Sequence, residues 1–506
     1  MHPLPACRHA VHFLCAALAA ASLLTFCLAQ TPPTAITPPP AAVDPIEGSW
    51  TGLVTAPDGR TAGVGFSFKR GKGAGLDLVF HMPAMFTYQA NLPEAVETKP
   101  DSYVIALLGT TLHREGDSLT GAFGLGKLPL RLKRGGSFEP EPPAPHYPAA
   151  PAPLWSRSLG CYTWASPVGR EDMIYVGTKD GKFHAAKATD GTEVWTWTGP
   201  NRIDGRAVIT DDRIYFVDGR VDLIALNRAG GSLAWRVPLH DASFVGGQPP
   251  ADNPTFNRRT ATPLVIADTV YCGSSDGGLY ALDAATGRKL WRHDARSPIF
   301  SGIAQVAGDV LSFGCMDGSV VQLNRRTRQE TSRMRTGGGV VTTPVFTAGK
   351  VVAGSRDYML YGFNAADGSV AWKFSYWFSW VESTPQLVDG VLYVGASDFR
   401  RVTALNPADG RALWSTDVRG IAWGWPLVTA DTVFIGTVAQ NVPGTLIHHT
   451  GGLMALDRKT GAVKWQHLSP VPPENSFGGY AGSLVLAGDK LIAIGYDGVL
   501  IAFPAK

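Results

Sequence analysis

The stretch "YCGSSDGGLYALDAATGRKLW", residues 271–291, has the most regular pattern in the chain. It consists of an apolar run, an Asp-Gly turn, a second alternating run, a Thr-Gly turn and a final Trp291. Alternation with a period of two predicts strands with one buried face. Glycine after Asp or Thr permits the positive φ of a tight turn. The stretch therefore predicts antiparallel strands joined by short turns.

The same pattern recurs along the chain. Trp195 and Trp235 end two copies 40 residues apart, and a degenerate copy, "LSFGCMDGSVVQLNRRTRQETS", has Ser332 in the tryptophan position. A fixed period near 40 that contains about four short strands is typical of a β-propeller. A tryptophan at this position buries roughly 150–250 Å² and can hold one blade against its neighbour. We interpret the motif as a packing device rather than as a catalytic site.

The two ends of the chain complete the ring. The C-terminal segment "GYAGSLVLAGDKLIAIGYDGVLIAF" contains only three strands, and Trp155 lies one period of 40 residues before Trp195. We predict that the strand at Trp155 is the outer strand of the last blade, which gives eight blades over residues 154–506. A shared blade removes exposed sheet edges and ties the termini together.

Two proline-rich segments, residues 30–45 and 137–153, are predicted linkers because proline favours an extended conformation. Between them, residues 46–136 contain alternating runs separated by glycine turns, such as "GVGFSFKR" and "LDLVFHM". They predict a small antiparallel, barrel-like β domain. Its opening, "GSWTG", resembles the first strand of lipocalin-like barrels, in which the Trp closes one end. A ligand cavity and a core filled by side chains both agree with the pattern, and we favour the filled core.

Residues 1–29 have the pattern of a signal peptide. Arg8 precedes an apolar run at 13–28, and small residues at Cys27 and Ala29 favour cleavage after Ala29. The run is shorter than the ~20 residues that span a bilayer, and no later stretch is apolar enough. We expect an exported protein, periplasmic or secreted, with no transmembrane span in the mature chain.

Composition excludes other classes of protein. The chain has 506 residues, 45% of them hydrophobic, and a formal net charge of +3, which indicates a globular protein that does not bind nucleic acid. The cysteines beyond the leader, Cys161, Cys272 and Cys315, are odd in number, so we expect buried thiols. His448 and His449 are adjacent and would point to opposite faces of an extended segment. We therefore expect a loop there, and no metal site.

The pattern "YxGxxDGxLYALDxxTGxxxW" resembles the repeats of pyrroloquinoline-quinone (PQQ) propellers. This resemblance implies an all-β, eight-bladed, quinoprotein alcohol dehydrogenase-like propeller. One branch of the family contains PQQ- and calcium-dependent alcohol or sugar dehydrogenases. The other, BamB-like branch is non-catalytic and binds partner proteins in outer-membrane assembly. The tryptophan-docking residues implied for this chain are Trp155, Trp195, Trp235, Trp291, Trp372, Trp414 and Trp465.

The enzyme branch requires more than blades. The resemblance implies a calcium held by carboxylate and amide oxygens, an Asp base and, in the alcohol dehydrogenases, a disulfide between adjacent cysteines. No Cys-Cys pair is present, and residues 154–506 leave little chain for active-site insertions. We therefore expect a monomeric, non-catalytic scaffold without a cofactor, which binds an envelope protein or a small ligand. In the alternative, a PQQ- and calcium-dependent dehydrogenase, Glu382 and Asp357 are the candidate ligand and base.

Candidate binding residues lie where the repeats differ. Propellers bind at the mouth of the central channel, so aromatic and charged residues in the connecting segments "FSYWFSWVESTP" and "RGIAWGWPL" suit a flat ligand, a polysaccharide or a peptide anchor. The alternative is that these aromatics fill gaps between blades. Two longer insertions, 240–259 and 439–450, are also candidate binding loops. The channel-mouth candidates are Arg356, Asp357, Trp377, Trp380, Glu382, Trp423 and Trp425.

Overall fold

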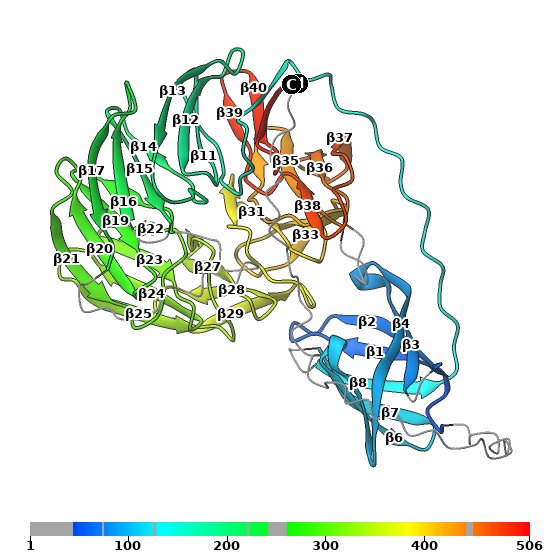
Figure 1. The fold of residues 1–506 in the computed structure, drawn as a ribbon. Helices are drawn as coiled ribbons and strands as arrows, with labels where there is room; N and C mark the ends of the chain where they lie inside the picture. Colours follow the sequence, from blue (N-terminus) through cyan, green and yellow to red (C-terminus); the bar gives the residue numbers. More distant parts are fainter. Residues whose placement is uncertain are drawn as a thin grey trace, which may run out of the picture.

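A closed eight-stranded barrel precedes an eight-bladed propeller in the computed structural model of the chain (Figure 1), which confirms the predicted fold class. The structure describes residues 44–72, 75–124, 128–219, 222–240, 261–441 and 449–505. The predicted signal peptide, the first linker up to residue 43, and residues 241–259 and 442–448 of the two insertions lie outside these ranges. Within them, no helix is both long and apolar enough to span a membrane.

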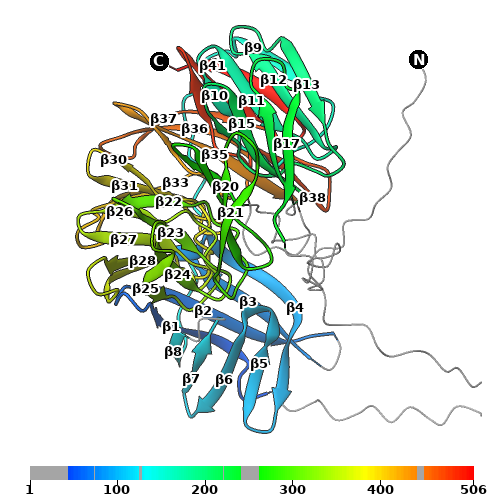
Figure 2. The same cartoon turned by 90° about the vertical axis from the view of Figure 1, so that its left-hand side faces the viewer.

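Each strand of the barrel pairs with the next, and pairing of the first with the last closes it (Figure 2). The strands are β1 (Gly48–Thr55), β2 (Thr61–Arg70), β3 (Leu76–Met82), β4 (Thr87–Lys99), β5 (Ser102–Ile105), β6 (Thr110–Glu115), β7 (Ser118–Phe123) and β8 (Leu128–Arg134). Two short 3-10 helices, η1 (Pro83–Met85) and η2 (Ala106–Leu108), lie between strands.

Aromatic side chains fill the barrel. The Phe66 ring lies 5.4 Å from that of Phe80 between ring centroids, and both are buried. Trp50 is fully buried and donates a 2.7 Å hydrogen bond from Nε1 to the Ile46 carbonyl. The Arg134 guanidinium carbon lies 4.3 Å from the Trp50 ring centroid. Trp50 and Arg134 thus close one end of the barrel, because the ring has apolar neighbours inside and a cation outside.

The propeller consists of eight antiparallel sheets, or blades, in sequence order. Blades one to four are β10 (Val168–Arg170), β11 (Met173–Gly177), β12 (Lys182–Lys187), β13 (Glu193–Thr198); β14 (Val208–Ile209), β15 (Arg213–Asp218), β16 (Asp222–Asn227), β17 (Leu233–Pro238); β18 (Leu264–Ile266), β19 (Thr269–Gly273), β20 (Gly278–Asp283), β21 (Lys289–Asp294); and β22 (Ala304–Ala307), β23 (Val310–Gly314), β24 (Ser319–Asn324), β25 (Gln329–Arg335).

Blades five to seven are β26 (Val345–Thr347), β27 (Lys350–Gly354), β28 (Met359–Asn364), β29 (Val370–Ser375); β30 (Gln386–Val388), β31 (Val391–Gly395), β32 (Arg401–Leu405), β33 (Ala412–Asp417); and β34 (Leu427–Val428), β35 (Thr432–Asn441), β36 (Gly452–Asp457), β37 (Val463–Leu468), with β38 (Ser476–Gly479) paired to β35. Blade eight is β39 (Val485–Ala487), β40 (Lys490–Ile494), β41 (Val499–Pro504) and β9 (Trp155–Ser158). Pairing of Trp155 with Ala502 confirms that both ends of the chain share the last blade.

Five of the seven predicted docking tryptophans pack on turn glycines of the following blades. A Cβ added to Gly410 would lie 2.5 Å from the Trp372 ring, and Gly410 has φ +72°. Four more glycine–tryptophan pairs repeat this contact at 2.3–2.7 Å: Gly191–Trp155, Gly231–Trp195, Gly287–Trp235 and Gly461–Trp414. Glycine is required here both by the left-handed backbone and by the ring that lies on it.

Hydrogen bonds fix the same rings. Trp372 donates from Nε1 to the Pro407 carbonyl at 2.9 Å, and Trp235 donates to the Ala284 carbonyl at 3.0 Å. Both acceptors lie three residues before the glycine under the ring. Each of these two indoles therefore holds two neighbouring blades together through apolar contact and one directed bond.

The barrel packs on blades five and six, and one hydrophobic cluster includes both domains. The Phe123 and Phe378 rings meet edge to face at 4.6 Å, and a Cβ on Gly124 would lie 2.0 Å from the Phe378 ring. The Asp58 carboxylate accepts a 2.7 Å hydrogen bond from the Ser375 N–H, and Arg60 donates to the Ser375 carbonyl. Apolar and polar contacts thus join the two domains.

The second proline-rich linker is attached at both ends. Phe138 stacks on His81 of the barrel at 5.1 Å, and Ala149 forms a parallel bridge with Gln466 of β37. Gln466 donates its N–H to the Pro148 carbonyl at 2.9 Å. Figure 1 shows the extended path of this segment between the two domains. A blade edge of this propeller therefore accepts an extended segment of chain.

Candidate functional site

A cavity of about 120 Å³ lies on the propeller axis, and all eight blades line it. Eight of its lining residues occupy one repeat position, two residues before the innermost strand of a blade: Ser166, Arg206, Thr262, Gly302, Thr343, Thr384, Trp425 and Ser483. The innermost strands converge on the axis, so these positions form a ring. Six of the eight are serine, threonine or glycine, which leaves room for the two large side chains.

The two large members of the ring contact each other. The Arg206 guanidinium carbon lies 4.7 Å from the Trp425 ring centroid. Among the described residues, no carboxylate or hydrogen-bond acceptor contacts the Arg206 side chain. Burial lowers the pKa of Arg206, because removal from water disfavours the charged form. The cavity therefore contains a partly desolvated cation supported by one aromatic ring.

Further aromatic rings form one wall of the cavity. Trp164 and Trp423 lie 5.2 Å apart between centroids, and both line the cavity. The Trp423 Nε1 donates a 2.9 Å hydrogen bond to the Ser397 hydroxyl, and the Trp425 backbone N–H donates to the Ser483 hydroxyl at 2.9 Å. These bonds hold the tryptophans in place, so the wall is fixed before any ligand arrives.

The carboxylates of the cavity are already bound by arginines. Glu382 is 5% exposed and accepts a 2.7 Å hydrogen bond from the Arg356 Nε. The Asp204 carboxylate lies 2.7 Å from the Arg202 Nε. Because both negative charges have their own cations, neither neutralises Arg206.

The structure brings together some of the sequence-predicted residues. Arg356 lies between Glu382 and the Trp380 ring, 4.7 Å from that ring, and Glu382, Trp423 and Trp425 line the cavity. Asp357 is not among the lining residues. It accepts hydrogen bonds from the Tyr361 hydroxyl at 2.5 Å and the Gly337 N–H at 2.6 Å, as a turn residue of blade five.

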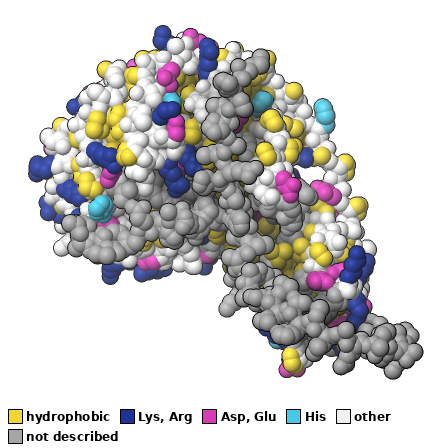
Figure 3. Space-filling model, viewed as in Figure 1, with side chains coloured by type: hydrophobic (Ala, Val, Ile, Leu, Met, Phe, Trp, Pro, Cys, Tyr) yellow, Lys and Arg dark blue, Asp and Glu magenta, His cyan; other side chains and the backbone are white. Residues whose placement is uncertain are grey.

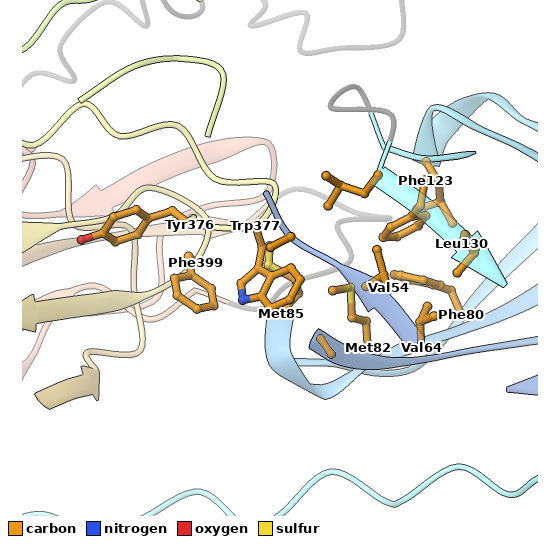
Figure 4. Close-up of a cluster of buried hydrophobic side chains, with 14 of the residues drawn as sticks. Val54, Val64, Phe80, Met82, Met85, Phe123, Leu130, Tyr376, Trp377 and Phe399 are labelled. Carbon is orange, nitrogen blue, oxygen red and sulfur yellow. The ribbon is translucent and has the colours of Figure 1, made fainter. Parts of the chain in front are cut away.

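Trp377 lies elsewhere, at the contact between the domains. It is 4% exposed and belongs to the cluster that includes the barrel. Figure 4 shows its indole beside Met85 of the barrel, with Phe399 close by. An isolated propeller sequence cannot reveal this placement, because the contacting residues come from another domain.

Sequence reasoning missed Arg206, Asp204 and Trp164. The segment "RIDGRAV" before β14 contains no aromatic residue, so it did not differ visibly from an ordinary loop. A signal was nevertheless present: Arg206 occupies the repeat position of Trp425 and Thr384, two residues before the innermost strand. Alignment of the repeats on that strand would have identified the only charged residue at this ring position.

A family model described as "Outer membrane protein assembly factor BamB" matches residues 148–219, 196–333 and 316–506. The chain belongs to this family. The BamB of Yersinia pestis is 24% identical over 252 residues, which cover 47% of this chain and 63% of that protein. The BamB of Bordetella pertussis is 24% identical over 48% of this chain and 50% of its own length. This BamB-family chain thus matches less than two thirds of these relatives.

Quinoprotein enzymes also resemble parts of the chain. The quinoprotein ethanol dehydrogenase of Pseudomonas putida is 33% identical over 69 residues, 14% of this chain and 11% of that enzyme. The quinohemoprotein alcohol dehydrogenase of Comamonas testosteroni has a TM-score of 0.54 at 14% identity, covering 70% of this chain and 76% of the enzyme chain. Likeness at this identity shows the fold alone.

The residues of the cavity do not fit a calcium ion. Calcium takes six to eight oxygen ligands, with carboxylates prominent among them. Here Glu382 and Asp204 are engaged by Arg356 and Arg202, and in the described ranges no three His, Cys, Asp or Glu side chains converge. We therefore derive no reaction step through PQQ or calcium.

Proposed function

We propose that this BamB-family chain is a non-catalytic binding scaffold of the cell envelope. Its axial cavity receives an acidic group, a side-chain or terminal carboxylate, of a partner protein. The observation that supports this proposal is Arg206, which faces the cavity, lies on Trp425 and has no carboxylate among the described residues. The family relationship supports the scaffold role, since the relatives are named as outer membrane protein assembly factors.

The chemistry of Arg206 favours a carboxylate. A guanidinium presents parallel N–H donors that match both oxygens of a carboxylate, and charged hydrogen bonds are stronger than neutral ones. The half-buried rings of Trp164 and Trp423 make one wall of the cavity apolar, which strengthens such a bond. A half-buried cation without a counter-charge loses part of its hydration, and an arriving anion compensates for that loss. The cavity is therefore suited to bind a negative group rather than to stabilise the fold.

The size of the cavity favours a protruding group over an enclosed ligand. A volume of about 120 Å³ is well below the roughly 300–1,000 Å³ of typical small-molecule pockets. A carboxylate with its adjoining carbons fits this space, whereas a saccharide ring with its hydroxyls needs more. We therefore favour a protein partner over a polysaccharide.

The proposed location is the periplasmic side of the envelope. The leader pattern at residues 1–29 supports export, and the names of the relatives support a site of action at the outer membrane. Basic and acidic side chains are interspersed on the propeller surface seen in Figure 3, which suits recognition by a local site rather than by a broad field of one charge. The partner is then an envelope protein, and the chain acts as a monomer.

Site-directed photocrosslinking in the native envelope tests this function. A benzoyl-phenylalanine at Thr262, in the ring of the cavity, should crosslink a defined protein, and the matched probe at Ala408, in a turn on the opposite face, should not. Arg206→Ala should abolish the Thr262 crosslink, while Arg206→Lys should retain part of it. Equal crosslinking with Arg206→Ala would contradict the proposal. So would stoichiometric PQQ uptake with calcium and dye-linked alcohol oxidation by the purified protein.

A further inference from the structure

Blade four lacks both aromatic residues that meet in most other blades. In blade two, Tyr215 of β15 lies 5.8 Å from the docking Trp235, and the equivalent pairs of blades one, three and six lie at 5.8–6.0 Å. In blade four the same two positions are Ser312 and Ser332, because both pair with Gln322 in the strand between them. Two rings are thus replaced by two hydroxymethyl groups.

A cavity of about 450 Å³ lies at this position, between blades four and five. Its apolar walls include Val306, Val310 and Phe346, and its polar lining includes Gln322 and Ser332. The volume falls in the range of ligand pockets, roughly 300–1,000 Å³. We call this cavity the rim slot. It lies at blade turns on one face of the propeller, and the axial cavity opens at the opposite face.

The floor of the rim slot matches the floor under the docked indoles. Gly368 has φ +74°, like Gly410 under Trp372 with φ +72°, but its nearest neighbour is the Ser332 hydroxyl, 3.0 Å from an added Cβ. Gly368 is half-buried, whereas Gly410 and the other glycines under rings are buried. The missing ring therefore leaves the surface of this turn open.

A hydrogen-bond acceptor is also in place. Ala365 lines the rim slot, and its carbonyl belongs to the residue three positions before Gly368. The equivalent carbonyls of Ala284 and Pro407 accept the indole N–H of a docked tryptophan at 3.0 and 2.9 Å. An indole in the rim slot would find the same acceptor.

Gln322 adds a second polar group. The other blades have alanine or glycine at its position: Ala185, Ala225, Ala281, Gly362, Ala404, Ala455 and Ala502. Gln322 is 6% exposed, lines the rim slot, and its carboxamide makes no hydrogen bond with the described residues. The carboxamide oxygen can share the ring N–H of a bound indole with the Ala365 carbonyl in a three-centre hydrogen bond.

We propose that the rim slot binds the indole side chain of a tryptophan presented by a partner polypeptide. At other blades, a turn glycine and a carbonyl acceptor hold an indole of this chain. The rim slot has the same turn glycine and carbonyl but no indole. A polypeptide is favoured because the slot adjoins β25, whose outer edge pairs with no described strand. The contact of Ala149 with β37 shows that such an edge accepts an extended segment.

Fluorine NMR with 5-fluoroindole and N-acetyl-5-fluorotryptophanamide tests the rim slot in the full chain. Both probes should bind the wild-type protein saturably. Ser332→Trp, which supplies the missing ring, should abolish both signals, while Thr198→Trp, which adds a ring to the exposed outer strand of blade one, should leave them unchanged. Saturable binding that survives in Ser332→Trp, or no binding to the wild type, would overturn the proposal. Binding of 5-fluoroindole alone would overturn the polypeptide ligand.

A second variant guards against misfolding of Ser332→Trp. Gln322→Leu keeps the volume and removes the carboxamide. The wild type should prefer indole over indene, which lacks the ring N–H, by roughly three- to tenfold, the worth of one neutral hydrogen bond. The preference should fall in Gln322→Leu, and an unchanged preference would contradict the role of Gln322. Arg206→Ala should not alter indole binding. The proposal for the rim slot is therefore tested independently of the proposal for the axial cavity.

Discussion

The Arg206 guanidinium carbon lies 4.7 Å from the Trp425 ring centroid, although the eighth and first blades separate the two residues in the ring. The small side chains at the other ring positions make this contact across the axis possible. The arrangement places one uncompensated cation in a cavity whose carboxylates are already paired. A substitution of Arg206 is therefore expected to weaken partner binding without lowering the stability of the fold.

Replacement of Arg206 by alanine should leave the melting temperature unchanged or raise it, because a half-buried charge without a counter-charge is lost. Binding of a carboxylate-bearing partner should weaken by more than about tenfold, since a hydrogen bond to a charged group contributes about 1.5–3 kcal/mol. Calorimetry and binding titration measure the two effects. Arg356→Ala is the contrasting variant: it leaves Glu382 buried without its cation and should lower stability. A marked loss of stability in Arg206→Ala would show a structural role.

Gly124→Ala should separate the barrel from the propeller. Its Cβ would lie 2.0 Å from the Phe378 ring at φ +72°, whereas Gly116→Ala introduces only the backbone strain, with φ +61° and open space around the Cβ. Limited proteolysis of the linker at residues 137–153 should accelerate in Gly124→Ala and not in Gly116→Ala. Equal cleavage of the two variants would show that the Phe123–Phe378 contact does not hold the domains together.

The blade-docking contact can be measured with three glycines. Gly410→Ala places a Cβ 2.5 Å from the Trp372 ring, while Gly390→Ala, with φ +75° and no neighbour within 4 Å, carries backbone strain alone, about 1–2 kcal/mol. Gly410→Ala should reduce the free energy of unfolding by roughly 3 kcal/mol or more, since close overlap adds about 1–3 kcal/mol. Gly368→Ala, under the rim slot, should lower the free energy of unfolding by about as much as Gly390→Ala does. Denaturant unfolding checks this order, and a Gly368 variant as damaging as the Gly410 variant would contradict the open slot.

Asp218 should make stability depend on pH. It is fully buried at the end of β15, both carboxylate oxygens lack hydrogen bonds, and burial raises its pKa to about 6. Between pH ~4 and ~6 the folded protein therefore keeps a proton that the unfolded chain releases, so the contribution of this group to stability falls as pH rises. Asp218→Asn should remove this dependence, up to about 3 kcal/mol, and stabilise the protein at pH 7.

Thermal unfolding of the wild type and Asp218→Asn at several pH values checks this prediction. Asp212→Asn is the control, because that side chain is 72% exposed in the same blade. Parallel pH profiles for the wild type and Asp218→Asn would contradict the assignment.

The sequence alone predicted the number of blades, the closing strand at Trp155 and the five tryptophans that pack on turn glycines. These features follow from a local pattern, since each blade contacts mainly its neighbours and repeats the same strands, turns and tryptophan. The degenerate unit with Ser332 was also visible, because a repeat reveals its own exceptions. The open slot that this exception leaves, with Gln322 and the Ala365 carbonyl, was not visible in the sequence.

Only the tertiary structure decided which aromatic residues face a cavity. Trp377 and Trp425 lie in similar aromatic segments, yet the barrel covers Trp377 whereas Trp425 meets Arg206 on the axis. Both outcomes depend on contacts between parts of the chain far apart in sequence: a second domain in one case and the opposite side of a ring in the other. Periodicity determines the blade around each residue, and ring closure and domain packing determine what each side chain meets.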